Sequence, residues 1–243
     1  MKLDRRVALI TGAARRVGRA IALRLAAAGC KTAIHYHRSD ADAAETVRLC
    51  RAEGVEAETF SADLADAAAI DPLVEAVCAR FGRLDFLINN ASTFEKMSLD
   101  TFDLAAWDET LRVNLTAPML LARAAAPQLR RNRGRIINLC DISTARPWPD
   151  RLAYMASKGG LETLTLALAK ALAPDVNVVG IAPGVAAWPD GYDAATRDRL
   201  TRRIPLGRPG TPEDIAALAH FLLAEGDYIT GTIIPVDGGR GIG

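Results

Sequence analysis

Tyr154 and Lys158 are the pair of side chains whose types and spacing most directly suggest chemistry. They lie four residues apart in LAYMASKGGLETL, whose apolar spacing predicts a helix, so both side chains lie on one face. A free phenol has a pKa near 10, and a neighbouring ammonium favours the phenolate. We therefore predict that Lys158 lowers the pKa of Tyr154 and that the pair acts in acid–base catalysis. The alternative is a solvated helix face, on which this spacing often occurs by chance.

A glycine-containing segment follows the first run of strand length. The apolar stretch Val7–Ile10 leads into TGAARRVG at Thr11–Gly18, where helical spacing begins. Small residues between a strand and a helix let the backbone turn tightly and approach a pyrophosphate at the positive end of the helix. The spacing is not GxGxxG, so the position of the segment, more than its two glycines, indicates a dinucleotide site.

The end of the second predicted strand indicates which nucleotide is bound. The chain has His37, Arg38 and Ser39 where an NAD site usually has an acidic residue. Arg38 can bind a 2′-phosphate as a fork, with Ser39 and His37 as further donors. Arg16 can close on the same phosphate. We therefore predict NADPH rather than NADH. The alternative is a solvated basic corner, and Asp40 would weaken the preference if it faced the ribose.

Polar residues also follow the third and fourth predicted strands. Asp63, which precedes Leu64, is placed to bond an adenine amino group. The run Asn89–Ser92 offers amides to a ribose and to neighbouring backbone. Considered alone, each is more typical of a turn residue that satisfies its own main chain.

Short apolar runs alternate with longer stretches of helical spacing along the chain. The runs are Val7–Ile10, Thr32–Tyr36, Val55–Phe60, Leu84–Ile88, Arg135–Leu139, Val176–Ile181 and Thr232–Val236. The helical stretches include Val17–Ala28, Ala67–Phe81, Trp107–Ala125 and Leu161–Ala173. This alternation predicts βαβ units, and runs such as VALI are typical of strands buried on both faces. We predict one α/β domain over residues 1–243, a doubly wound sheet of about seven mostly parallel strands with helices on both faces.

The segment at residues 185–203 interrupts this alternation. It contains a Pro-Asp-Gly turn and then a short polar helix. Ligands of open parallel sheets bind beyond the carboxyl ends of the strands, so this insertion is predicted to be a substrate lid. Trp188 and Tyr192 would be its ligand-facing groups, or they would simply fix the loop to the body of the domain.

The composition excludes several classes of partner. Lys plus Arg number 30 and Asp plus Glu 29, so no global field would hold nucleic acid or an anionic membrane. No apolar run approaches the roughly 20 residues of a membrane span, and no secretory signal is recognisable. The four cysteines are predicted to be small buried residues in a reducing, cytoplasmic compartment. No metal site is predicted, because the three histidines are not at ligand spacing.

Several of these segments together resemble the short-chain dehydrogenase/reductase family. They are TGxxxRxG at Thr11–Gly18, NNA at Asn89–Ala91, Asn114, Tyr154-x-x-x-Lys158, Pro183-Gly184 and the Asp237-Gly238-Gly239 end. The match spans essentially the whole chain. It implies a Rossmann-type fold, a nicotinamide cofactor and a catalytic set of Asn, Ser, Tyr and Lys, in which Asn114, Tyr154 and Lys158 match three places.

Two departures from the family pattern are informative. Arg16 replaces the usual middle glycine, and Asp141 stands thirteen residues before Tyr154, where the family has serine. With HYHRS at residues 35–39, these are similar to the pteridine reductase branch, including the bacterial dihydromonapterin reductases. The resemblance implies that Arg16 serves the cofactor phosphates and that Asp141 works with Tyr154 in protonation. It also implies that Phe94 stacks on the pterin and that Ser92 bonds it.

The carboxylate of Asp141 has a physical interpretation of its own. A serine hydroxyl polarises a carbonyl that becomes an alkoxide, whereas a carboxylate opposes that developing charge. Reduction of a C=N bond needs a proton at nitrogen, which Asp141 linked to Tyr154 can help to deliver. A carboxylate also suits the donor-rich edge of an aminopyrimidine. Asp141 therefore favours imine over ketone reduction. The alternative is that Asp141 caps a turn and Ser143 takes the place of the serine, as in an ordinary carbonyl reductase.

The sequence thus predicts an NADPH-dependent reductase that transfers hydride to a dihydropterin. The alternatives are a carbonyl reductase acting on 3-oxoacyl thioesters or small ketones and, more distantly, a regulatory protein that binds NADP(H) without turnover. The predicted catalytic residues are Asn114, Asp141, Tyr154 and Lys158, and the predicted substrate contacts are Ser92, Phe94, Asp141, Tyr154 and Trp188. The predicted cofactor contacts are Gly12, Arg16, Val17, Gly18, His37, Arg38, Ser39, Asp63, Leu64, Asn90, Ala91, Ser92, Tyr154, Lys158, Pro183 and Gly184.

Assembly is predicted only through the resemblance. Family members are usually tetramers in which long helices, here Trp107–Ala125 and Leu152–Ala173, and the last strand pack across two-fold axes. A homotetramer is therefore expected. Arg240 would reach a neighbour's active site, as in pteridine reductases, or would lie in a disordered tail.

Overall fold

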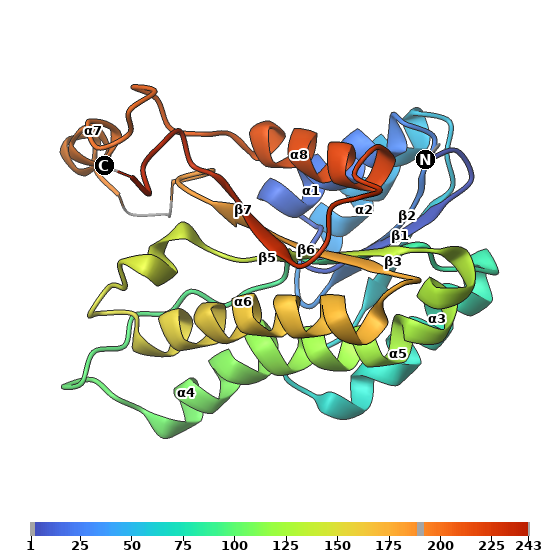
Figure 1. Ribbon diagram of the computed structural model, residues 1–243, viewed down its shortest axis with the longest axis horizontal. Coiled ribbons are helices and arrows are strands. Elements are labelled where there is room, and N and C mark those ends of the chain that lie inside the picture. The colour runs from blue at the N-terminus through green and yellow to red at the C-terminus, as the bar shows by residue number, and fades with distance from the viewer. Residues whose placement is uncertain (1–2, 189–191, 243) are drawn as a thin grey trace.

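The computed structural model describes residues 3–188 and 192–242, which form one seven-stranded sheet covered by helices (Figure 1). The strands are β1 (Val7–Ile10), β2 (Lys31–Tyr36), β3 (Ala57–Ser61), β4 (Phe86–Asn89), β5 (Arg135–Leu139), β6 (Asn177–Pro183) and β7 (Thr232–Val236). Neighbouring strands pair in parallel in the order β3-β2-β1-β4-β5-β6-β7. The predicted fold class is confirmed. The strand order reverses between β1 and β4, where open sheets of this kind bind ligands.

Helices cover both faces of the sheet. They are α1 (Arg16–Ala26), α2 (Asp40–Ala52), α3 (Ile70–Phe81), α4 (Leu104–Leu111), α5 (Ala117–Asn132), α6 (Leu152–Leu172), α7 (Ala194–Thr201) and α8 (Pro212–Ala224). One face carries α1, α2 and α8, and the other carries α3, α5 and α6 (Figure 1). Two of these helices, α2 and α8, are additional to the stretches named from the sequence.

The strands are buried on both sides, which explains their continuous hydrophobicity. In β1, Val7 and Leu9 pack into the core beneath α3, α5 and α6, while Ala8 and Ile10 pack into the core beneath α1 and α8. Successive side chains of a strand point to opposite faces, so this strand contributes to two separate cores. Each core fixes the register of the sheet, and with it the positions of the loops at the carboxyl ends of the strands.

The predicted helix at Trp107–Ala125 is in fact two helices joined by a π-helical turn. The turn spans Arg112–Thr116, between the end of α4 and the start of α5, and α5 continues to Asn132. Such turns occur frequently at functional sites, and this one contains Asn114. The next helix, α6, carries both Tyr154 and Lys158, as the sequence predicts.

The segment at residues 185–203 contains the predicted short helix, α7. Asp193 caps it by accepting a hydrogen bond of 2.8 Å from the Thr196 nitrogen. No residue of α7 is buried. The predicted Pro-Asp-Gly turn at residues 189–191 lies outside the described residues. The helix lies at the same end of the molecule as the C-terminus (Figure 1).

The four cysteines are free thiols, and three of them are buried as predicted. Cys30, Cys50 and Cys140 are buried, and Cys78 is half-buried on α3. Within residues 3–188 and 192–242, no group of His, Cys, Asp and Glu side chains is placed to hold a metal ion. No helix in this part of the chain has the length and apolar character to cross a membrane.

Candidate active site

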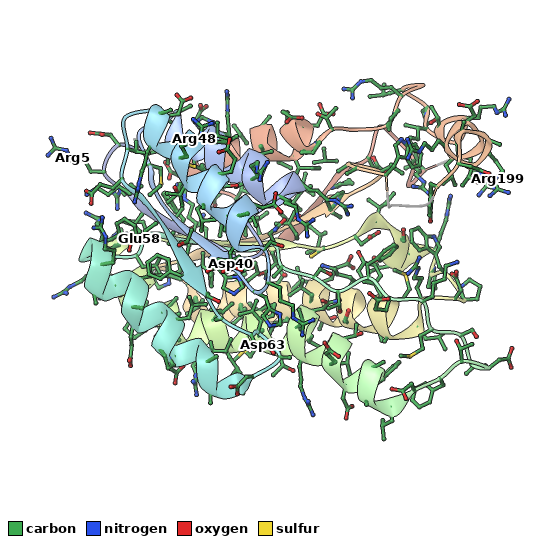
Figure 2. All side chains as sticks on the ribbon, turned by 180° about the vertical axis from the view of Figure 1, so that it is seen from behind. Arg5, Asp40, Arg48, Glu58, Asp63 and Arg199 are labelled. Carbon is green, nitrogen blue, oxygen red and sulfur yellow. The ribbon has the colours of Figure 1, made fainter. Side chains whose placement is uncertain are left out.

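A cavity of about 800 Å³ lies at the carboxyl ends of the strands and is here called the cofactor cavity. Every residue that the sequence predicts to bind the cofactor lines it, from Gly12 after β1 to Gly184 after β6. Asp63, which follows β3, is labelled in Figure 2. The sheet therefore brings together motifs that are spread over most of the chain.

Hydrogen bonds from the loop after β4 hold the glycine segment. Thr11 Oγ1 accepts from the Asn90 nitrogen at 2.9 Å and from the Ala91 nitrogen at 3.0 Å. Asn90 Nδ2 donates to the carbonyls of Thr11 at 2.8 Å and Gly12 at 3.0 Å. Gly12 has a φ of +61°, and a Cβ on it would lie 2.9 Å from Ala91 Cα. The amide of Asn90 therefore satisfies neighbouring backbone, and the side chain also lines the cavity.

His35 joins this segment to the end of β3, a role that the sequence does not predict. Its Nδ1 accepts from the Gly12 nitrogen at 3.1 Å, and its Nε2 lies 3.1 Å from the Ala62 carbonyl. Burial lowers the pKa of His35 to about 4. The ring is therefore neutral at physiological pH, and Nε2 carries the hydrogen. The signal for this role is a histidine inside a strand that is mostly buried, because a buried polar group requires partners.

The basic corner predicted to bind a 2′-phosphate lies at the end of β2. Arg38 is exposed, and no carboxylate among the described residues pairs with it. Arg15, which the sequence does not single out, donates to Ser39 Oγ at 3.2 Å and lies 3.4 Å from Asp42. The corner therefore combines a hydroxyl, a paired guanidinium and an unpaired one on the cavity wall.

Two acidic residues near this corner differ in orientation. Asp63 accepts from the Ala65 nitrogen at 2.9 Å, and its other oxygen lies 3.8 Å from His37. Asp40 does not line the cofactor cavity; it lies against the hydroxyl of Tyr36 and raises the pKa of that phenol. The acid that would have weakened a preference for NADPH thus faces a tyrosine.

Tyr154 and Asp141 meet at the centre of the site. Tyr154 donates to Asp141 Oδ2 at 2.7 Å, and the Ser143 nitrogen donates to Asp141 Oδ1 at 2.7 Å. Burial and the neighbouring carboxylate raise the pKa of Tyr154 well above its ordinary value. The prediction that Lys158 lowers this pKa is therefore wrong. Asp141 is within hydrogen-bond distance of the phenol, whereas Lys158 Nζ lies 5.7 Å from the ring centroid.

Lys158 is buried in the wall of the cofactor cavity. Its Nζ donates to the Leu139 carbonyl at the end of β5, at 2.6 Å. Burial lowers the pKa of Lys158. The hydrogen bond to Leu139 fixes the Lys158 Nζ on the cavity wall, one helical turn from Tyr154.

Asn114 lies next to the site but lines neither of its cavities. Its Oδ1 accepts from the Thr93 nitrogen at 2.8 Å, and its Nδ2 donates to the Thr93 carbonyl at 3.0 Å and to Ser157 Oγ at 3.1 Å. The side chain is buried and joins the loop before Phe94 to α6. In this structure Asn114 acts as a positioning residue.

A second cavity, of about 450 Å³, adjoins the first and is here called the substrate cavity. Four of the five predicted substrate contacts line it, namely Phe94, Asp141, Tyr154 and Trp188. The fifth, Ser92, lines the cofactor cavity instead. Trp188 and Tyr192 both lie on the wall of the substrate cavity, with ring centroids 6.2 Å apart.

Phe94 is held by residues that the sequence does not reveal as part of the site. The Arg151 guanidinium lies 3.9 Å from the centroid of the Phe94 ring, and its Nη1 donates to the Phe94 carbonyl at 2.7 Å. The Phe94 ring meets Tyr154 edge-on at 4.7 Å and Trp148 at 5.8 Å. Arg151 is buried immediately before α6, and nothing in its sequence context distinguishes it from an exposed arginine.

Arg16 and Arg240 both line the substrate cavity, a position that the sequence does not predict for either residue. Arg16 lines both cavities and has a φ of +51°, a conformation that favours glycine. A strained backbone at a cavity wall is typical of functional positions. Arg240 lines the substrate cavity of its own chain. The resemblance implies instead that Arg240 would reach the active site of a neighbouring subunit.

Comparisons with known proteins agree with this geometry. A family model described as enoyl-(acyl carrier protein) reductase matches residues 12–240. The chain is 36% identical over 241 residues to a 3-oxoacyl-(acyl-carrier-protein) reductase of Synechocystis sp., covering 98% of this chain and 97% of the relative. It is 36% identical over 237 residues to a 3-oxoacyl-(acyl-carrier-protein) reductase of Staphylococcus aureus, covering 96% of each. These names agree with the carbonyl-reductase alternative rather than with the pteridine reductase branch.

Solved structures give the same family. One, described as a short-chain dehydrogenase/reductase from Burkholderia xenovorans, has a TM-score of 0.91 and 35% identity and covers 98% of each chain. Another, described as a short-chain alcohol dehydrogenase from Sinorhizobium meliloti, has a TM-score of 0.93 and 35% identity, covering 98% of this chain and 97% of that one. Since these matches extend over nearly the whole length of a chain that holds Tyr154 and Lys158 at one cavity, the protein is an oxidoreductase of the short-chain dehydrogenase/reductase family.

Proposed function

We propose that the protein is an NADPH-dependent reductase of a C=N bond in a dihydropterin. The observation that carries this proposal is the hydrogen bond of 2.7 Å from Tyr154 to Asp141. A carboxylate at this position opposes the alkoxide that forms from a ketone. It does not oppose the protonation of an imine nitrogen, which ends as a neutral amine.

The lining of the cofactor cavity supports NADPH as the cofactor. Arg38 and Ser39 would hold the 2′-phosphate, because a guanidinium and a hydroxyl together supply the donors that a phosphate accepts. Gly12 leaves no room for a side chain beside Ala91 and brings backbone to the cavity wall. When bound, the cofactor supplies the hydride for the carbon end of the double bond.

The protein itself must supply the proton for the nitrogen end. Tyr154 remains a protonated phenol at neutral pH, because burial and Asp141 both disfavour the phenolate. Tyr154 lines both cavities, so we propose that its hydroxyl donates to a substrate nitrogen there. Asp141, whose other oxygen is held by the Ser143 nitrogen, is then placed to return a proton from solvent to the phenol. The C=N bond becomes C–H and N–H, so atoms and charge balance.

The lining of the substrate cavity suits a flat nitrogen heterocycle. Phe94, Trp148 and Trp188 provide aromatic surface, and Arg151 covers the Phe94 ring. Each oxygen of Asp141 already accepts one hydrogen bond and has a further lone pair for a donor on an aminopyrimidine edge. A heterocycle stacked on the aromatic side chains, with its donor edge at Asp141, would use both the aromatic surface and the remaining lone pairs of the carboxylate.

A carbonyl reductase acting on 3-oxoacyl thioesters is the second candidate. The observation that favours it is the name shared by relatives that are 36% identical over almost the whole chain. Its mechanism would require Ser143 to polarise the carbonyl. In the structure Ser143 contacts Asp141 through its backbone nitrogen, and it is Asp141 that faces Tyr154.

Steady-state assays with NADPH distinguish the two candidates. The substrates are dihydrobiopterin, dihydromonapterin, dihydrofolate and an acetoacetyl thioester. We expect turnover of at least one pterin and a fall of about 100-fold in that turnover for Asp141→Ser, since positioned acid–base groups contribute 10²- to 10⁴-fold. Asp100→Ser, which changes an exposed aspartate, is the matched control. Turnover of the thioester alone would overturn the pterin assignment.

We also propose that residues 185–203 form a lid over the substrate cavity. Trp188, Tyr192 and several α7 residues line that cavity, yet no residue of α7 is buried in the body of the domain. Elements with few buried contacts open at low free-energy cost. Protection of α7 amides from hydrogen exchange should rise when cofactor and substrate are both bound, and unchanged protection would contradict the lid.

We propose a homotetramer in a cytoplasmic setting. The helices expected at the subunit interfaces carry exposed apolar side chains, including Leu104 on α4, Met119 on α5 and Leu166 on α6. Packing such faces across two-fold axes would remove them from water. Light scattering of the purified protein measures the subunit count directly.

A further inference from the structure

A third cavity, of about 620 Å³, opens beside the substrate cavity and is here called the arginine pocket. Arg146, Arg202, Arg203 and Arg240 line it, together with Trp148 and a few small or apolar residues. Trp148, Arg203 and Arg240 also line the substrate cavity, so the two cavities adjoin. The lining includes four guanidinium groups and no carboxylate.

Three of the four arginines of this pocket differ from the arginines that pair with a carboxylate elsewhere in the protein. Arg123 pairs with Asp71 at 2.7 Å, and Arg208 pairs with Asp214 at 2.9 Å. Within the described part of the chain, the side chains of Arg202, Arg203 and Arg240 have no carboxylate partner. Like charges gathered around one cavity repel each other, so an anion that enters it is attracted by several cations at once.

One side of the pocket, the turn that carries Arg240, is held in place by hydrogen bonds. Asp237 accepts from the Gly239 nitrogen at 2.9 Å and from the Gly241 nitrogen at 2.6 Å, which closes a turn around Arg240. The Leu206 nitrogen donates to the Gly238 carbonyl at 3.1 Å, joining this turn to the segment that follows α7. Arg202 and Arg203 directly follow α7, whose labelled residue Arg199 lies at the opposite end of the molecule from Arg5 (Figure 2).

We propose that the arginine pocket binds the anionic end of the substrate, a carboxylate or phosphate on a flexible tail. The tail would extend from a ring held at Phe94 and Tyr154, past Trp148, to Arg202, Arg203 and Arg240. Guanidinium forks bind both kinds of oxyanion. The proposal rests on the proposed function only for the identity of the ring, since the charge of the pocket and the residues it shares with the substrate cavity do not depend on it.

Two substrates that differ in the tail test the proposal by kinetics. Dihydrofolate carries a glutamate tail with two carboxylates, and dihydrobiopterin carries a neutral tail on the same ring. In Arg202→Gln/Arg240→Gln, we expect the ratio of kcat/KM for dihydrofolate to that for dihydrobiopterin to fall roughly 10- to 30-fold, mainly through KM. The same ratio should fall in wild type between low and high salt. Arg208→Gln is the control, and a ratio that changes less than two-fold in the double variant overturns the proposal.

A binding experiment decides the matter if no pterin is reduced. Inorganic pyrophosphate is titrated by calorimetry into the protein saturated with NADP, so that the cofactor cavity is already filled. We expect one site per chain, weakened at least ten-fold in Arg202→Gln/Arg240→Gln and unchanged in Arg208→Gln. Equal affinity of wild type and the double variant, or no binding to wild type, overturns the arginine pocket as an anion site. Absence of pterin turnover with intact pyrophosphate binding would instead overturn only the proposed function.

Discussion

The cofactor cavity differs from the substrate side of the protein, which comprises the substrate cavity, α7 and the arginine pocket, in how its polar groups are paired. Around the cofactor cavity, polar groups satisfy one another: Asn90 binds the backbone of the glycine segment, and His35 joins that segment to the end of β3. On the substrate side, Arg202 and Arg203 have no carboxylate partner within the described residues, and no residue of α7 is buried. The first region holds its shape without a ligand, whereas the second leaves charge and surface for a ligand to cover.

Tyr154 belongs to both regions, so its replacement tests the comparison most severely. In Tyr154→Phe the phenol proton is lost while the ring and its packing against Phe94 are kept. We expect kcat to fall about 10³-fold, within the range for a positioned general acid. Tyr228→Phe is the control, because Tyr228 is fully exposed. A loss smaller than ten-fold in kcat would mean that Tyr154 does not supply the proton.

The self-contained character of the cofactor region predicts a pH dependence of stability. Because the folded state lowers the pKa of His35 from 6.5 to about 4, the unfolded chain binds the proton more readily between these values. The free energy of unfolding should therefore fall as the pH drops from about 6.5 to 4, by about 3 kcal/mol from this group. Below pH 4 this group should cause no further loss.

His35→Gln identifies that contribution. A glutamine amide can accept from the Gly12 nitrogen and donate to the Ala62 carbonyl, but it does not titrate. Urea unfolding at several pH values between 7 and 4 should show a shallower slope for His35→Gln than for wild type. Equal slopes would mean that burial of His35 has no effect on the acid stability of this region.

The basic corner is the one part of the cofactor region that resembles the substrate side, because Arg38 lacks a carboxylate partner among the described residues. In Arg38→Ala we expect KM for NADPH to rise roughly 30-fold, as for loss of a charge-assisted hydrogen bond. KM for NADH should change little, since NADH has no 2′-phosphate. Arg48→Ala is the control; Arg48 lies on α2 and pairs with Glu45 at 2.7 Å (Figure 2). Equal effects on both cofactors would remove Arg38 from phosphate recognition.

The two regions also differ in how far the sequence predicts them. Most cofactor contacts could be predicted because their motifs directly follow a strand, and parallel strands place their carboxyl ends at one edge. Tyr154 and Lys158, which lie within α6, are predicted from their spacing instead. The arginine pocket could not, because Arg146, Arg202 and Arg240 come from separate segments that meet only through tertiary packing. Sequence spacing is informative within one element, and it loses that power across loops.

The same limit explains the error about the pKa of Tyr154. The four-residue spacing correctly placed Lys158 and Tyr154 on one helix. It carried no information on which charge would lie nearest the phenol. The strand that precedes α6 and its turn bring Asp141 to 2.7 Å, and this carboxylate with burial reverses the direction of the shift. The positions of charges in three dimensions, rather than their spacing along a helix, decide such shifts.

Ser143→Ala gives the smallest expected effect and the finest distinction within the substrate side. If Asp141 performs the acid–base role, the Ser143 hydroxyl is dispensable, because the backbone nitrogen that binds Asp141 remains in the variant. We therefore expect pterin turnover to stay within about two-fold of wild type. If Ser143 polarises a carbonyl, its removal should cost about 10²- to 10³-fold in thioester turnover, as for loss of one donor to an oxyanion. Measuring both substrates with Ser143→Ala and Asp141→Ser therefore assigns the chemistry to one of two side chains that are only two residues apart, and a large loss of pterin turnover in Ser143→Ala would contradict the role given to Asp141.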